Sequence, residues 1–73
     1  MKQKLTAIIE RENGMYVALC PELDIASQGR SIESARDNLQ EAIELFFETA
    51  SPAEVKERLH GETFITQVEV AIG

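Results

Sequence analysis

The stretch from Ser31 to Ala50 constrains the fold more than any other part of this sequence. At about 100° per residue, its apolar side chains fall within one helical arc of roughly 100°. They are Ile32, Ala35, Leu39, Ala42, Ile43, Phe46 and Ala50, with Phe47 at the margin of the arc. A helix that is apolar on one side only buries that side against another element. Because the Ser31 hydroxyl suits an N-cap, we expect a long helix from this point, packed on a sheet through Leu39, Ile43 and Phe46.

The residues before this helix predict the sheet. Residues 2–12 alternate in polarity, with Leu5, Ala7 and Ile9 on one face, which is typical of a strand. The dipeptide Asn13-Gly14 then favours a type I′ hairpin turn, because that turn needs positive φ at both central positions. Residues 15–20 are expected to return as a second strand, and residues 25–28 to form a short third one.

The residues after the helix predict a second helix and a last strand. Ser51 followed by Pro52 is typical of a helix start and predicts a short helix to about Leu59. Between residues 63 and 72, one face is apolar and the other more polar, which indicates a strand. The apolar positions are Phe64, Val68, Val70 and Ile72, alternating with Ile65, Gln67 and Glu69. The expected fold is one α+β domain over residues 1–73, an antiparallel β-β-β-α-(α)-β sheet with one long helix packed on one face.

Length and charge exclude several classes of protein. The 73 residues include 7 Lys and Arg against 13 Asp and Glu, a net charge of −6, so no basic surface for nucleic acid binding is expected. The chain lacks a signal-peptide pattern and any run of about 20 apolar residues, and its single cysteine cannot form an internal disulfide. These features predict a cytoplasmic protein without membrane contact.

Because so short a chain without disulfides or a metal is marginally stable, we expect a homodimer or larger assembly.

Five carboxylates fall within an arc of about 80° on the expected long helix, nearly opposite its apolar side. They are Glu33, Asp37, Glu41, Glu44 and Glu48. Like charges at positions i and i+4 disfavour a helix by about 0.2–0.5 kcal/mol per pair. Two interpretations remain open: a solvated outer face, or a docking surface for a basic partner.

The residue types that carry catalysis give no convincing set. A nucleophilic Cys20 would need a base to lower its thiol pKa, and the sequence contains one histidine, His60, expected near the end of the second helix. Glu10, Glu22 and Asp24 are the candidate ligands for catalytic metal ions, but their spacing has no particular signature. No glycine-rich phosphate loop is present. We therefore expect a protein that is not an enzyme and that uses no metal or cofactor.

The run from Tyr16 to Gly29, continued through Ser31–Ala35 and Asn38–Leu45, resembles the central motif of the HicB-like antitoxins over about 30 of the 73 residues. The resemblance implies a degenerate ribonuclease-H-like domain that has lost catalysis. It implies the antitoxin of a type II toxin-antitoxin pair, which binds a small basic messenger-RNA ribonuclease, HicA, and covers its active site. The roles that it implies for the motif positions are mainly structural; these positions are Tyr16, Cys20, Pro21, Glu22, Leu23 and Gly29. Pro21 and Gly29 are expected at corners, and Tyr16 and Leu23 in packing.

The sequence departs from the family pattern at its C-terminal end. Many HicB-like proteins carry a C-terminal DNA-binding segment, whereas this sequence ends at Gly73, directly after the last expected strand. Direct binding to promoter DNA is therefore not expected. The same departure leaves an alternative function open, a solitary oligomeric scaffold or small-ligand-binding module with no toxin partner.

Overall fold

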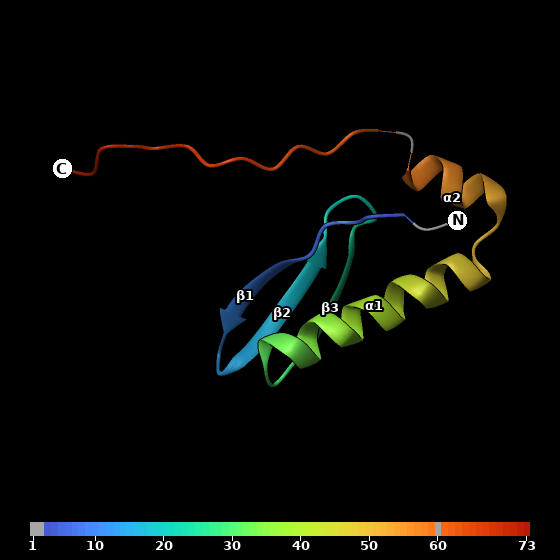
Figure 1. Cartoon of the computed structure of the whole chain (residues 1–73), viewed down its shortest axis with the longest axis horizontal. Helices are drawn as coiled ribbons and strands as arrows, with labels where there is room; N and C mark the ends of the chain where they lie inside the picture. Colours follow the sequence, from blue (N-terminus) through green and yellow to red (C-terminus); the bar gives the residue numbers. More distant parts are fainter. Residues whose placement is uncertain (1–2, 60) are drawn as a thin grey trace.

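A three-stranded antiparallel sheet and a long helix that crosses one of its faces form the body of the molecule (Figure 1). The computed structural model describes residues 3–59 and 61–73. Its elements, in chain order, are β1 (Ile8–Glu12), β2 (Met15–Cys20), β3 (Ile25–Gly29), α1 (Ile32–Thr49) and α2 (Pro52–Arg58). The strands lie in the order β1-β2-β3, which confirms the predicted α+β class with one long helix on the sheet.

The turn between β1 and β2 has the geometry that its sequence predicts. Asn13 and Gly14 have φ of 48° and 79°, the positive values that a type I′ turn needs. The hairpin pairs Glu12 with Met15 and Ile9 with Ala18. β1 begins only at Ile8 and is shorter than expected, but the apolar pattern before it holds in part, because Leu5 and Ile9 both pack against the core.

Both helices begin at the predicted caps. The Ser31 hydroxyl accepts a hydrogen bond from the Ser34 amide at 3.0 Å, and the Ser34 hydroxyl accepts one from the Ser31 amide at 3.0 Å. This reciprocal pair satisfies two backbone donors at the start of α1. At α2, the Ser51 hydroxyl accepts from the Glu54 amide at 3.2 Å, and Pro52 occupies the first turn. No helix within the described residues has the length and apolar character needed to span a bilayer.

The core lies between the sheet and α1. Its buried side chains are Ala18, Cys20, Leu23, Ala35 and Leu39. Ile43 and Phe46 pack against this cluster while remaining partly exposed, so the predicted packing side of α1 is confirmed along most of its length. Ile32 is an exception, with 55% of its surface exposed. It is the first residue of α1, and the first side chain of the helix to be buried is Ala35, one turn further on.

Gly29 is required by a close approach of the chain. A Cβ atom at this position would lie 2.3 Å from the Ser34 hydroxyl and 2.5 Å from the Ala35 nitrogen, far inside van der Waals contact. The first turn of α1 therefore rests directly on the end of β3, where any larger side chain would push it away.

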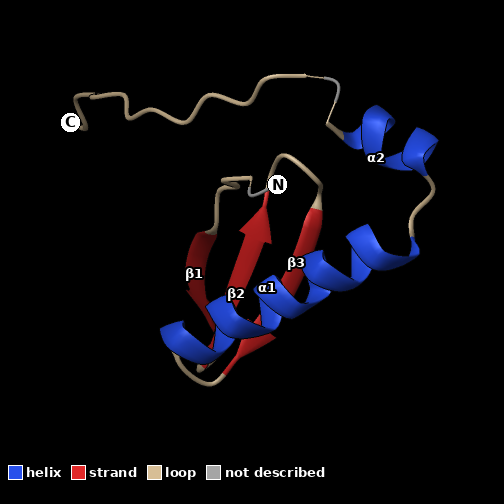
Figure 2. Ribbon diagram, turned by 45° about the vertical axis from the view of Figure 1, so that its right-hand side comes forward, coloured by secondary structure: helices blue, strands red, loops and turns tan. Residues whose placement is uncertain are grey.

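The predicted last strand is wrong for the single chain. Residues 63–72, which we call the C-terminal arm, form no strand; they run as an extended, unpaired segment past the end of the sheet where β2 terminates and then beyond it (Figures 1 and 2). The alternation of apolar residues favours an extended backbone, but a strand also needs a neighbour for its hydrogen bonds, and none of the described strands pairs with the arm. The Cα radius of gyration is 14.4 Å, against about 11 Å for a compact chain of this length.

Candidate interaction surface

The five predicted carboxylates share one exposed side of α1, which we call the acidic face. They are Glu33, Asp37, Glu41, Glu44 and Glu48, and every one of them is solvent-exposed. Within residues 3–59 and 61–73 one member forms an ion pair: Asp37 Oδ1 lies 3.6 Å from Arg36 Nε, with both side chains more than 60% exposed. Such a surface pair contributes at most about 1 kcal/mol. The acidic face thus presents a row of negative charge with little compensation from its own chain.

The acidic face is maintained by packing on the opposite side of the helix. The pairs Glu33–Asp37, Asp37–Glu41 and Glu44–Glu48 are each four residues apart, a spacing at which like charges repel by about 0.2–0.5 kcal/mol. The free energy gained by burying Leu39 and Ala35 is larger than the cost of this repulsion, because a fully buried leucine alone contributes about 1.5–3 kcal/mol. A cationic partner would remove the remaining repulsion.

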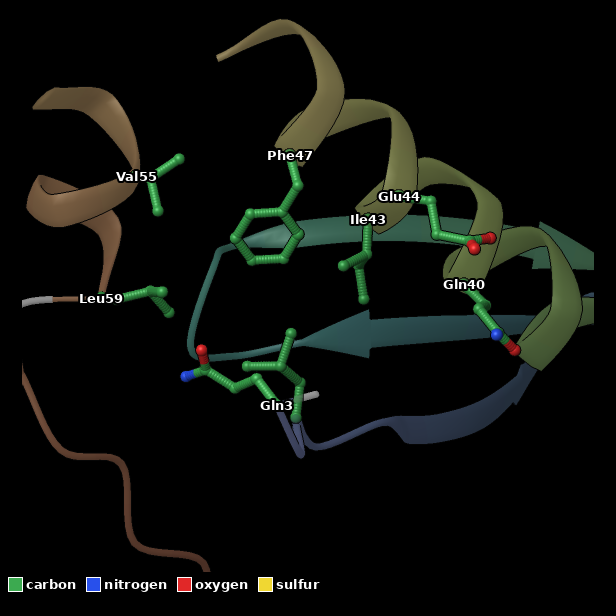
Figure 3. Close-up of a pocket in the computed structure, with 8 residues that line it drawn as sticks. Gln3, Gln40, Ile43, Glu44, Phe47, Val55 and Leu59 are labelled. Carbon is green, nitrogen blue, oxygen red and sulfur yellow. The ribbon is translucent and has the colours of Figure 1, made fainter. Parts of the chain in front are cut away.

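An apolar groove lies next to the acidic face, between α1, α2 and the residues that precede β1 (Figure 3). Its volume is about 680 Å³. Its walls come from three parts of the chain: Gln3 and Leu5; Gln40, Ile43, Glu44 and Phe47 of α1; and Val55 and Leu59 from α2 and its end. Figure 3 shows Phe47, Val55 and Leu59 directed toward the same space. Sequence reasoning missed this groove, since it depends on where α2 packs.

Arg58 fixes α2 in the position that shapes the groove. Its guanidinium group donates a hydrogen bond to the Leu23 carbonyl oxygen and lies over the Phe46 ring, 5.3 Å from the ring centroid. Phe46 in turn meets Phe47 edge to face, with centroids 5.4 Å apart. The two adjacent phenylalanines therefore have different roles, because Phe46 joins the core while Phe47 faces the groove.

Glu22, one of the motif residues, joins the β2–β3 connection to the residues that precede β1. Glu22 accepts hydrogen bonds from the Thr6 amide, 3.1 Å from each carboxylate oxygen, and from the Thr6 hydroxyl at 2.6 Å. Partial burial on its own would raise the pKa of Glu22. The hydrogen bonds from Thr6, from the backbone amide of Glu22 and from the Cys20 thiol outweigh burial and lower that pKa below its usual value. Glu22 is therefore a charged clamp between the β2–β3 connection and the residues before β1.

Cys20 has the properties of a packing residue. It is fully buried, and burial together with the neighbouring Glu22 carboxylate raises the pKa of its thiol, although backbone hydrogen bonding near Leu23 opposes the shift. A raised pKa reduces the thiolate fraction that a nucleophile needs. His60, the histidine considered as its base, lies outside the described residues.

The three carboxylates that the sequence offers for metal binding form no common group in the described part of the chain. Glu22 is engaged by Thr6, Glu10 is exposed on β1, and Asp24 is exposed in the β2–β3 connection with φ of 55°. In the part of the chain that the structure describes, no three His, Cys, Asp or Glu side chains are grouped so that they could hold a metal ion. The structure therefore offers no support for a two-metal arrangement at these positions.

The other motif positions have mainly packing roles. Leu23 is fully buried, and Tyr16 packs against the core at its edge, with the Arg11 guanidinium 5.9 Å from its ring centroid. Pro21 begins the connection that follows β2. Gly29 is the last residue of β3, directly before the chain turns into α1, and it permits the close approach of that helix. The motif therefore specifies how α1 is seated on the sheet, and thereby where the acidic face points.

No protein-family model, curated protein or solved structure matches this chain.

Proposed function

We propose that this protein is an antitoxin that neutralises a small basic ribonuclease of the HicA type by binding it, without chemistry of its own. The observation that carries the proposal is the acidic face of α1, five exposed carboxylates of which one has an ion-pair partner within the described residues. The net charge of −6 adds to the attraction for a cationic protein. The motif that resembles the HicB-like antitoxins supports the same partner class.

The proposed mechanism is stoichiometric occlusion of the ribonuclease active site. Complementary charge accelerates the encounter and orients the two proteins, while apolar contacts at the edge of the acidic face slow dissociation of the complex. The groove adjoins the acidic face at Glu44, which belongs to both surfaces. A basic protein that binds the acidic face would therefore have apolar side chains within reach, Phe47 among them.

The motif residues support this proposal through the position of α1. Cys20 and Leu23 lie in the core under α1, and Gly29 lets the first turn of the helix rest on β3. The helix is thus held at a fixed orientation, with its charges turned outward. A rigid charged helix loses less conformational entropy on binding than a mobile one.

Inhibition of RNA cleavage tests the proposal. The chain is co-expressed with the product of an adjacent small basic reading frame, the complex is purified, and messenger-RNA cleavage by the toxin is measured with increasing amounts of this chain. We expect cleavage to stop at a fixed molar ratio. A toxin that stays active with a saturating amount of this chain would refute the proposal.

The groove favours a second candidate function, a ligand-binding module with no toxin partner. Its volume of about 680 Å³ lies in the range of small-molecule sites, and its lining is mostly apolar with a few polar groups, as in such sites. This candidate predicts saturable chemical-shift changes at the Val55 and Leu59 methyl groups when apolar fragments are titrated. Fragments that shift neither residue would eliminate it.

A further inference from the structure

We propose that the C-terminal arm of one chain binds a second copy of this chain, where it adds a strand to the open edge of β1 and seats its apolar side in the groove. The exchange is reciprocal, so each copy gives an arm and receives one. This inference goes beyond the proposed function and does not depend on it, because it rests on the C-terminal arm and the edge of β1, whereas the proposed function rests on the acidic face; the two share the groove residue Phe47.

The arm has the chemistry of a strand that needs a partner. Its apolar side consists of Phe64, Val68, Val70 and Ile72, which are 70–94% exposed in the single chain. Between residues 63 and 72 there is one charged side chain, Glu69, and no proline or glycine. Solvated tails are instead rich in charge and poor in β-branched residues. An exposed segment with so little charge is an aggregation hazard unless it is paired.

The edge of β1 is the better of the two sheet edges to receive the arm. Among the described strands, β1 pairs on one side with β2 and has no strand on the other. At the opposite edge, α1 packs most closely against β3, and Asn38 donates a hydrogen bond to the Gln28 carbonyl of that strand at 2.8 Å. The groove also lies on the β1 side, where Gln3 and Leu5 form part of its wall.

Length and side-chain character match between the arm and its site. The arm has ten residues and, fully extended, spans about 33 Å; residues 3–12, along which it would lie, are also ten. Successive side chains of a strand point to opposite faces. One face of the added strand therefore carries Phe64, Val68 and Val70 toward Leu5, Phe47 and Leu59 of the groove.

A second copy is the occupant that the chain itself specifies. The arm runs from the end of α2 past its own sheet without pairing with it (Figures 1 and 2), while the described part of the same chain leaves both the strand edge and the groove open. Exchange of an identical element between two copies closes with two-fold symmetry and at low cost, since each contact is made twice. The arm is almost uncharged, so it approaches a copy of net charge −6 without strong repulsion.

The mass of the full-length protein in solution tests the exchange. Sedimentation equilibrium should give twice the 8.1 kDa of one chain. The double variant V68D/V70D should raise the dissociation constant at least 100-fold and give the single-chain mass, because both carboxylates would enter an apolar groove. The matched control Q67D/A71D adds the same charge to the other side of the arm and should leave the dimer intact.

A photo-cross-linking residue in place of Val68 locates the arm. We expect a cross-linked product of two chains that joins the arm to peptides containing Phe47 or Leu59. A single-chain mass for the unaltered protein would overturn the proposal, as would a cross-link within one chain, which indicates that the arm folds onto its own sheet. Dissociation of the control variant, or persistence of the dimer in V68D/V70D, would refute the claim that the side of the arm with Val68 and Val70 enters the groove.

Discussion

Glu22 and Thr6, sixteen residues apart, are joined by three hydrogen bonds in which the carboxylate accepts from both the amide and the hydroxyl of Thr6. Residues 3–7 pair with no described strand, so this clamp fixes the chain just before β1. Leu5, which packs on the core and lines the groove, is its immediate neighbour. The clamp thus links a motif residue to the shape of the groove.

Replacement of Glu22 by Gln should lower the free energy of unfolding by about 1–2 kcal/mol at neutral pH, since hydrogen bonds to a charged group are lost. The lowered pKa of Glu22 fixes the pH dependence. A carboxyl group whose pKa is lower in the folded state stabilises the fold above its unfolded pKa, and this contribution disappears as the pH falls through the folded value. Urea denaturation from pH 7 to pH 3 measures this. The free energies of unfolding of the variant and the unaltered protein should differ by a constant amount down to about pH 4.5, and the difference should shrink below that pH. A Glu12→Gln control, on an exposed carboxylate, should change the free energy of unfolding at neutral pH by less than about 0.5 kcal/mol.

Gly29→Ala should lower the free energy of unfolding by about 1–3 kcal/mol, because the new methyl group meets the backbone of α1 and the helix must shift. Gly73→Ala is the matched control, since a Cβ there meets no atom within 4 Å. Thermal unfolding monitored by circular dichroism compares the two. Equal stabilities would show that α1 is not seated on Gly29.

Two leucines of α1 give a matched test of its packing side. Leu39 is 2% exposed and Leu45 is 59% exposed. Leu39→Ala should therefore reduce the free energy of unfolding by about 2–5 kcal/mol, and Leu45→Ala by less than about 1 kcal/mol. Chemical denaturation of both variants measures the two losses. A larger loss for Leu45→Ala than for Leu39→Ala would show that the opposite side of the helix packs against the sheet.

Cys20 should resist alkylation in the folded protein, because it is fully buried and burial raises the pKa of its thiol. Iodoacetamide labelling followed by mass spectrometry should detect modification only after the chain is unfolded in urea. Rapid labelling of the folded protein at neutral pH would instead indicate a reactive thiol, and would contradict the assignment of Cys20 as a packing residue.

Features decided by residues close in the sequence could be predicted. The Asn13-Gly14 turn, the Ser31 and Ser51 caps and the burial of Leu39 each follow from a few adjacent residues or from one helical period, and all are confirmed. The exposure of all five carboxylates of the acidic face follows from the same period.

Features decided by distant contacts could not be predicted. The groove depends on the hydrogen bond between Arg58 and Leu23, thirty-five residues apart, and neither residue type carries a signal for it. The C-terminal arm shows the same limit, because alternation specifies a strand without specifying its partner. The expected fourth strand was wrong for a single chain for this reason, and we propose that its partner is another copy.

The acidic face makes a final prediction about association kinetics with the basic ribonuclease. E41K/E48K raises the net charge by four and, if the face is the docking surface, should lower the association rate constant at least 10-fold at low salt, with a smaller effect on dissociation. E10K/E12K makes the same change of charge on β1, away from α1, and should lower the rate much less. Surface plasmon resonance from 50 to 300 mM salt separates the two, because screening should bring the rates together as salt increases. If both variants slow association equally, net charge alone attracts the partner, and the acidic face is only a solvated side of the helix.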